Sequence, residues 1–401
     1  MQANSPGLPS RIVMLTSGIP ATLCFTAISP ILPKMDAALA DGPGDAFLVK
    51  MVLAVVGLAM VFGSPLAGWL ADKISRATLM TTAMLVWAAF GCMGYLIADL
   101  HVMVGSRLIV GLAAATALTV GLTMIGDLED PALRLKYMGV QVAISTITSI
   151  ITSPIAGVIG DIYWRLPFLL YAISLPLALI AWSLRGNEPP RALAEASSTD
   201  DPAAGKFRFP FGLMFLGLCC GTITFAPVTY MPFHFRDLGV DQAKIIAIAL
   251  SAETVAIAIM ASQYGRARKY LSTDSVFTVS FLLSGAGTAI AALATDWRIA
   301  ALGLLVFGFG VGWFAANVVA RASAFSAPQY RGRTVGLVKG AHLFAAFLAV
   351  VALEPVGNAG GPSAVLLVLN ALAWIIALYF ATRIYGAKGR AAPLAIAEKA
   401  A

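Results

Sequence analysis

Long apolar stretches separated by short polar turns run through almost the whole chain. Runs of about 18 or more mostly apolar residues predict twelve helices, which start near residues 10, 47, 77, 102, 138, 166, 210, 242, 274, 299, 334 and 363. A bilayer core of about 30 Å takes roughly 20 apolar residues per helix. Twelve helices therefore use about 240 residues and leave no room for a large soluble domain. The pattern predicts an all-α membrane protein with twelve transmembrane helices.

One polar stretch divides these helices six and six. Residues 185–209 contain Glu-Pro-Pro, Ser-Ser and Asp-Asp, are too polar to enter lipid, and are predicted to form a cytoplasmic linker. We expect one six-helix bundle at residues 1–184 and a second at residues 210–401, which ends in a short cytoplasmic tail. The basic turn after the second helix recurs after the eighth, which favours an internal duplication.

Composition supports this class of protein. Hydrophobic residues make up 59% of the 401 positions and charged residues only 12%, about half the roughly 25% of an ordinary soluble domain. The first apolar run is too long for a signal peptide and lacks a cleavage site, so it is expected to stay as the first span. All four cysteines fall in apolar stretches, and no disulfide framework is expected.

The distribution of basic residues orients the chain. With both ends on one side, 19 of the 27 Lys and Arg residues fall on that side and two, Arg107 and Lys339, fall within the membrane. Because Lys and Arg concentrate in short cytoplasmic loops, both termini are predicted to be cytoplasmic. Their scatter along the chain, rather than on one face, argues against a nucleic-acid partner. Six basic residues are assigned to the outside: Lys34, Lys50, Arg165, Arg236, Lys244 and Arg298.

Several short segments carry a family resemblance. They are Pro30-Ile-Leu-Pro33, Gly68-Trp-Leu-Ala-Asp72-Lys73-Ile-Ser-Arg76, Arg107-Leu-Ile-Val-Gly111, Ser153-Pro154-Ile-Ala-Gly157-Val-Ile-Gly160 and Trp164-Arg165-Leu-Pro-Phe168. In order and spacing this set resembles the major facilitator superfamily of secondary transporters, and most of all its branch of drug:proton antiporters with twelve spans. The resemblance covers nearly the whole chain. It implies the major facilitator fold in two six-helix bundles and alternating access around a midplane site.

The resemblance also implies a conformational latch at the cytoplasmic ends of the helices. Asp72 would meet the positive N-terminal dipole of the eleventh helix, an interaction worth about 0.3–1 kcal/mol. Arg76 would brace against Asp127, and Gly68 and Lys73 complete the loop motif. A solvated loop charge is the alternative for Asp72. The segment from Ser153 through Pro154 and Gly157 to Gly160 is similar to the motif associated with antiporters.

Ionisable groups inside spans are costly, and each is a functional hypothesis. Glu253 lies about eleven residues into the eighth helix, roughly 16 Å deep at 1.5 Å per residue, and is expected to be the one acidic residue near the midplane. Since burial disfavours a charged carboxylate, Glu253 is the first candidate for the proton-coupling group. The alternative is a structural pair with a lysine. His342 is the second candidate, although a packing histidine is an equal reading.

Two basic residues, Lys339 and Arg107, lie within predicted spans. Lys339 and His342 share a face of the eleventh helix, where they would pair with Glu253 or bind an anionic substrate. Arg107 cannot lose its charge, and the resemblance implies that it stabilises a proton-coupling network; otherwise it reaches to the outer surface.

Candidate substrate contacts come mainly from the first and seventh helices, because amphiphilic substrates need adaptable aromatic surface with a few polar anchors. Besides Lys339, these candidates are Phe25, Thr26, Phe225, Tyr230 and Asn317.

We therefore expect a proton-coupled exporter of small amphiphilic molecules or drugs, with a small-molecule substrate and protons as its partners, monomeric in the lipid bilayer of a bacterial inner (plasma) membrane. The alternative is uptake or facilitated transport of a small organic anion or metabolite by the same fold. No Gly-x-x-x-x-Gly-Lys-Ser/Thr sequence is present, and the three histidines lie in separate elements. We expect no ATP hydrolysis, no enzymatic activity, no cofactor and no metal site.

Overall fold

The computed structural model describes residues 6–42, 44–185, 207–327 and 330–397. Eleven helical segments of this part are long and apolar enough to cross a membrane, and the last, Arg331–Ile384, has 54 residues. Such a helix is about 81 Å long, more than two crossings of a core of about 30 Å. It bends at Gly361, where φ is 72° and ψ −177°, a backbone conformation that suits glycine because it has no Cβ. The bend makes two spans of this segment, so the twelve predicted crossings are confirmed.

The first half contains six spans. In order, its elements are α1 (Leu8–Thr16), α2 (Ile19–Thr26), the 3₁₀ turn η1 (Ser29–Ile31), α3 (Leu32–Leu39), α4 (Asp45–Lys73), α5 (Arg76–Cys92), the 3₁₀ turn η2 (Met93–Tyr95), α6 (Leu100–Gly126), α7 (Pro131–Ile162), the 3₁₀ segment η3 (Leu166–Ile173) and α8 (Ser174–Ser183).

The second half contains the other six. Its elements are α9 (Phe211–Asp237), α10 (Ala243–Tyr270), α11 (Thr273–Ala292), α12 (Trp297–Phe325) and α13 (Arg331–Ala397). The last of these supplies two spans, one on each side of Gly361. Most of the predicted linker lies outside the described residues, so the division at residues 185–209 stays a prediction.

Polar side chains fix where several helices begin. The Ser75 hydroxyl accepts a hydrogen bond from the backbone N–H of Thr78 at 3.2 Å, and the Asp99 carboxylate accepts one from Val102 at 2.9 Å. Asp130 does the same at the start of α7. These bonds satisfy backbone donors that have no partner within the helix, so each turn between spans ends at a defined residue.

The first span differs from the single helix that its hydropathy predicts. It consists of α1, α2, η1 and α3, and a proline stands at one of the first two positions of each piece: Pro9, Pro20, Pro30 and Pro33. Proline has no N–H and clashes with the preceding turn, so it is tolerated at a helix start and not in its middle. The prolines therefore break this span into short pieces.

Each half has its own apolar core. In the second half, Phe277 stacks on Phe380 and Phe281 on Phe314, with ring centroids 4.5 and 5.2 Å apart. The core of the first half surrounds Trp87, which is fully buried. Offset aromatic stacking stabilises such ring pairs beyond the contribution of their buried area. Each half is therefore stabilised by its own core.

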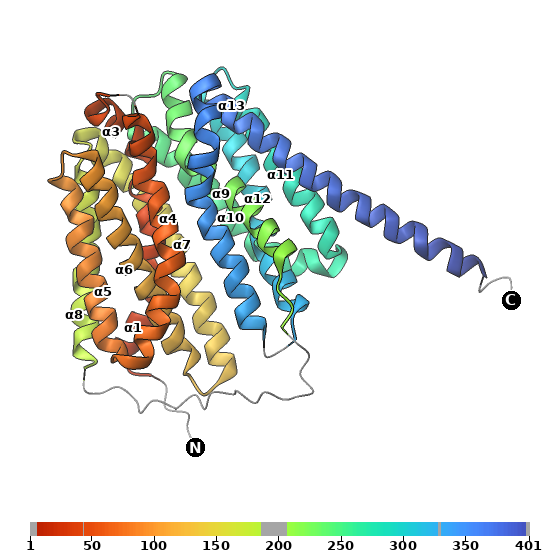
Figure 1. Ribbon diagram of the computed structural model, residues 1–401, viewed down its shortest axis with the longest axis horizontal. Coiled ribbons are helices and arrows are strands. Elements are labelled where there is room, and N and C mark those ends of the chain that lie inside the picture. The colour runs from red at the N-terminus through yellow and green to blue at the C-terminus, as the bar shows by residue number, and fades with distance from the viewer. Residues whose placement is uncertain (1–5, 43, 186–206, 328–329, 398–401) are drawn as a thin grey trace.

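Figure 1 shows the two halves side by side, with α1 near the bottom and α3 at the top of the first half. The halves meet chiefly where α4 packs along α13 and α7 along α10. We call the end of the molecule where α8 ends and α9 begins the linker side, and the end near α3 and Gly361 the far side.

Candidate functional site

A cluster of three rings joins the halves at their centre. Phe25 of α2 lies 5.2 Å from Phe225 of α9, and Phe225 lies 5.4 Å from the His342 ring of α13, measured between centroids. All three side chains are partly exposed. The structure thus brings together three residues that the sequence nominates separately, and Thr26 follows Phe25 directly. Such a surface contacts flat or apolar groups of a ligand and offers the imidazole as its polar anchor.

Glu253 is buried in α10, with 4% of its surface exposed. Its backbone carbonyl lies against Gly308 of α12, where an added Cβ would come within 2.6 Å. Among the described residues, its carboxyl group has no hydrogen-bond or ion-pair partner, and no ion pair joins it to Lys339 or His342. A buried carboxylate without such partners is energetically costly.

Arg107 is fully buried in α6. Its guanidinium donates to the backbone carbonyls of Phe90 at 2.9 Å and Gly91 at 3.2 Å, which lie in the last turn of α5, and stacks 5.1 Å from the Phe168 ring centroid. The negative end of a helix dipole stabilises a cation placed there. Arg107 therefore does not reach the surface, and no acidic side chain of the described part forms an ion pair with it.

Three further candidates lie apart from the ring cluster. Asn317 is fully buried, donates to the Thr273 carbonyl and accepts from the Tyr264 hydroxyl, both at 2.9 Å. Tyr230 is also buried. Lys339 is exposed on α13. The Asn317 amide thus links α10, α11 and α12, and substrate contact by any of the three stays a prediction.

The loop motif after α4 forms part of the expected contacts. An ion pair joins Arg76 to Asp127, the two partners named from the sequence, and the Lys73 ammonium lies 3.7 Å from the Trp69 ring centroid. Asp72 is exposed in the last turn of α4, and a Cβ added at Gly68 would meet no atom within 4 Å. The latch role of this segment stays a prediction.

The antiporter-like segment lies in the contact between α7 and α10. Pro154 lies inside α7, and the Ser153 hydroxyl donates to the Ala247 carbonyl at 3.3 Å. A Cβ added at Gly157 would lie 2.6 Å from the Ala247 Cβ, and one at Gly160 would lie 2.5 Å from the Ile31 Cγ2. Glycine at these two positions lets α7 approach α10 and η1 closely.

Replacing Gly157 with leucine should force α7 away from α10 and open the far side. Overpacking costs about 1–3 kcal/mol, so a cysteine placed at Ser29, which is buried between the halves, should react about fivefold or more faster with a membrane-impermeant maleimide. The parent is a chain whose four native cysteines are replaced. Gly139→Leu on the same helix is the control, because nothing lies within 4 Å of a Cβ there. Equal labelling of both variants would contradict the prediction.

Sequence reasoning missed a buried charge cluster on the far side. Lys50 of α4 donates to both oxygens of the Glu354 carboxylate of α13 at 2.8 Å, and the Tyr230 hydroxyl donates to the same carboxylate at 3.2 Å. The Lys50 ammonium lies 5.3 Å from the centroid of the Tyr230 ring. The position of Lys50 near a helix start suggests a loop charge on the outside, but the structure buries its side chain between α4 and α13. The signal was present, because Lys50 and Glu354 are both ionisable residues within apolar runs.

Other polar contacts join the halves on this same side. Arg236 of α9 pairs with Asp36 of α3 at 2.7 Å, and the Ser29 hydroxyl donates to the Val228 carbonyl at 2.5 Å. The Asp161 carboxylate accepts hydrogen bonds from the first backbone N–H groups of α10 at 2.7 and 3.1 Å, where the helix dipole favours an anion. These contacts close the far side.

On the linker side the same face of α4 becomes exposed. Near the far side, Met51 and Val55 pack against α13 in one cluster, with Leu58 at its edge. One and two turns further on, this face continues with Phe62 and Leu66, which are 66% and 49% exposed. The change indicates that α4 and α13 diverge toward the linker side.

Twelve spans in two halves, closed against each other on one side of a central ring cluster, form the architecture in which membrane transporters bind their substrates between two bundles. The sequence profile of the Major Facilitator Superfamily matches residues 14–349. The chain belongs to this family, which is a family of membrane transporters and not of enzymes, and it is an integral membrane protein.

Curated relatives differ in the transport that their names describe. The chain is 22% identical over 176 residues to the inner membrane transport protein YnfM of Escherichia coli, covering 43% of this chain and 41% of YnfM. It is 25% identical over 317 residues to the minor myo-inositol transporter IolF of Bacillus subtilis, covering 71% and 70%. It is 23% identical over 184 residues to the multidrug transporter MdtP of Bacillus subtilis, covering 45% and 33%. The chain therefore spans less than half of the length of YnfM and of MdtP.

Solved structures share the fold. The crystal structure of the nucleoside transporter NupG superimposes with a TM-score of 0.74 at 15% identity, covering 93% of this chain and 99% of that chain. At this identity the likeness shows the fold alone, and it agrees with the two-bundle architecture that the sequence predicts.

Proposed function

We propose that this transporter exports small amphiphilic molecules in exchange for protons, by alternating access between its two halves. The observation that carries the proposal is the cluster of Phe25, Phe225 and His342, which combines apolar rings with one polar anchor where the halves meet. Adaptable aromatic surfaces of this kind suit substrates that share amphiphilic character rather than one shape. The similarity to the multidrug transporter MdtP supports it.

Glu253 is proposed as the proton-coupling group. It is buried, has no polar partner in the described part of the chain, and lies in α10, one of the helices at the interface between the halves. A carboxyl group in this position changes its hydration when the halves move apart, and a change in hydration alters its tendency to bind a proton. Arg107 and His342 are proposed to influence this step. Lys339, which is exposed near the linker-side end of α13, is proposed to contact substrate.

Orientation and assembly belong to the same proposal. The sequence assigns 19 basic residues to predicted loops on the side of the termini and six to the opposite side, which favours cytoplasmic termini in a bacterial plasma membrane. The described conformation is then closed toward the outside, with the latch around Asp72 and Arg76 stabilising the opposite state. We propose that the protein works as a monomer.

A direct test uses the purified full chain in liposomes, with ethidium, an amphiphilic cation, as the probe. An imposed pH gradient should speed the movement of ethidium against its own gradient, and a protonophore should abolish the effect. Transport that ignores the pH gradient would contradict proton coupling. Absence of movement for ethidium and for a panel of neutral and anionic amphiphiles would contradict the substrate class.

A second candidate is uptake or facilitated transport of a small organic anion or metabolite. Lys339 is exposed one helical turn before His342 on α13, and the relative IolF, of which the chain covers 70%, is a minor myo-inositol transporter. Saturable counterflow of myo-inositol without a pH gradient would favour this candidate over export.

Phe225→Ala should weaken substrate binding about 3- to 10-fold, because an aromatic pair contributes about 0.5–1.5 kcal/mol beyond its buried area. Phe225 lies between both other rings of the cluster, so its loss removes two contacts at once. Fluorescence titration with ethidium measures the change. Tyr270→Ala is the control, since Tyr270 is 88% exposed at the end of α10. Unchanged affinity in Phe225→Ala would place the substrate elsewhere.

A further inference from the structure

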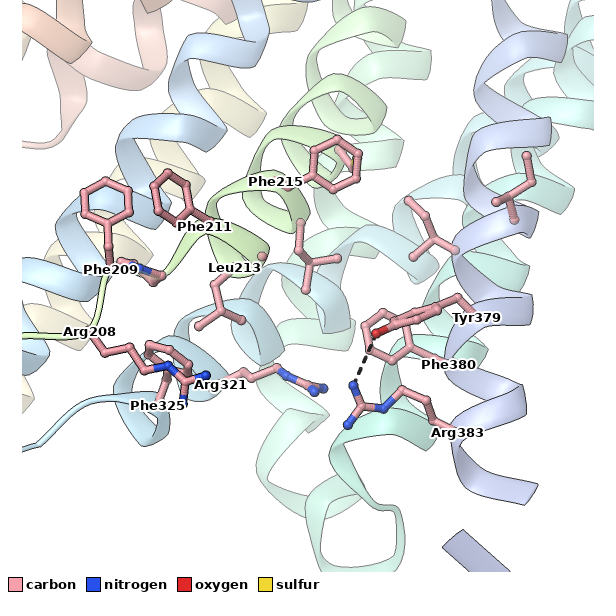
Figure 2. Close-up of a pocket in the computed structure, with 16 residues that line it drawn as sticks. Arg208, Phe209, Phe211, Leu213, Phe215, Arg321, Phe325, Tyr379, Phe380 and Arg383 are labelled. Carbon is pink, nitrogen blue, oxygen red and sulfur yellow. Dashed lines mark hydrogen bonds between the residues drawn. The ribbon is translucent and has the colours of Figure 1, made fainter. Parts of the chain in front are cut away.

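A cavity of about 730 Å³ opens on the wall of the second half, between α9, α12 and α13 (Figure 2). Its large apolar side chains include Phe211, Phe215 and Ile375, which are 74%, 68% and 66% exposed. They lie on helices that cross the membrane, so this opening faces the acyl chains of lipids and not water. The cavity is separate from the ring cluster between the halves.

Three arginines border one end of this cavity. Figure 2 shows Arg208, Arg321 and Arg383 together along its lower rim, below the rings of Phe211 and Phe215. They lie at the linker side, just before α9, near the end of α12 and beyond the middle of α13. Cations thus border one end of a groove whose remaining lining is mostly apolar, which suits the head group and the tails of a lipid.

One carboxylate compensates these charges only in part. Asp274 of α11 pairs with Arg321 at 2.5 Å and with Arg383 at 3.3 Å, and Arg208 forms no ion pair with any residue that the structure describes. The guanidinium of Arg208 instead lies 5.6 Å from the Phe325 ring centroid. The four charged groups carry a net charge of +2, which favours an anion at the rim.

The corresponding place in the first half is filled. There the first, fourth and sixth spans pack directly through small apolar side chains, namely Val13, Ala117, Val120, Ala178 and Ala181, which are all buried in one cluster. The seventh, tenth and twelfth spans of the second half hold the cavity instead. The fold therefore does not require an opening here, and the second half differs by large aromatic groups and by arginines.

We propose that this groove binds one anionic phospholipid from the leaflet on the linker side. Its phosphate would be held by Arg208 and Arg383, and an acyl chain would lie along Phe211 and Phe215. Guanidinium groups bind phosphate oxygens with paired hydrogen bonds, and basic pockets between spans suit anionic head groups. A lipid such as phosphatidylcholine carries its own cation and does not neutralise the rim. This site lies beyond the proposed function and does not depend on it.

The test measures phosphatidylglycerol bound to the purified full chain by native mass spectrometry, after equilibration in nanodiscs of phosphatidylcholine and phosphatidylglycerol. The variant Arg208→Gln/Arg383→Gln keeps the pair of Arg321 with Asp274. It should bind about tenfold less phosphatidylglycerol, since each basic residue near an anionic lipid adds to the attraction. The matched control is Arg266→Gln/Arg268→Gln, which removes two charges on the same side of the membrane at the exposed end of α10; it should stay within about twofold.

A second variant tests the apolar end with the arginines intact. Leu216→Trp places a larger side chain in the groove and should also lower phosphatidylglycerol binding, and it decides the matter alone if the double variant does not fold. If both double arginine variants lost phosphatidylglycerol binding equally, the proposal would be overturned, because the total charge of this side and not the groove would then determine binding. The proposal would also be overturned if inorganic phosphate alone displaced phosphatidylglycerol, or if the protein bound phosphatidylcholine as well as phosphatidylglycerol.

Discussion

Glu354→Gln should open the far side of the transporter. The substitution keeps the shape of the side chain but leaves the Lys50 ammonium buried without its counter-charge. Removing one partner of a buried ion pair costs about 3–5 kcal/mol, and this cost is relieved when water enters between α4 and α13. The equilibrium between conformations should therefore shift toward the far-side-open state by about a hundredfold or more.

The measurement is maleimide labelling of a cysteine at Ser29 in the cysteine-replaced chain, applied to cells. Glu129→Gln is the matched control, because Glu129 is an exposed acid on the linker side. The double variant Lys50→Met/Glu354→Met should return labelling toward the parent rate, since no buried charge then remains unpaired. Parent-like labelling in Glu354→Gln would show that this ion pair does not hold the far side closed.

Glu253→Gln should abolish the response of transport to a pH gradient, leaving the rate seen without one. The amide has nearly the shape of the carboxyl group but binds no proton near neutral pH, and Glu253 has no partner in the described structure that the change would disturb. Substrate exchange without a gradient should persist, because the ring cluster is unaltered. The assay compares both rates in the same proteoliposomes.

Asp241→Asn provides the control for this experiment, since Asp241 is exposed in the turn before α10. Retention of the full pH response by Glu253→Gln would move the coupling role to another group, of which His342 is the next candidate. Loss of exchange together with the pH response would instead indicate a structural role for Glu253.

The spans were predictable from sequence because burial in lipid demands long apolar runs. Even the bend at Gly361 agrees with the predicted start of the twelfth helix near residue 363. The sequence shows that Lys50 and Glu354 are ionisable residues within apolar runs, but not that they pair, since they are 304 positions apart and the position of Lys50 near a helix start resembles that of a loop charge. Which helices pair across the halves is a tertiary property that hydropathy does not carry.

The candidate site shows the same division between local and tertiary information. Phe25, Phe225 and His342 were each selected from sequence by residue type and depth, yet their contact depends on how three helices are rotated. The same criteria selected Tyr230 and Asn317, whose side chains bond to Glu354 and to α11. Residue type and depth cannot separate a group that faces a cavity from one that faces a neighbouring helix.

The proline breaks in the first span bear on how the halves move. A continuous helix bends only by weakening several consecutive backbone hydrogen bonds, whereas Pro20, Pro30 and Pro33 have already removed such bonds from the ladder. Between α2 and α3 the chain can thus change direction at little further energetic cost. The first span can flex at these joints, so alternation need not be the rotation of two rigid blocks.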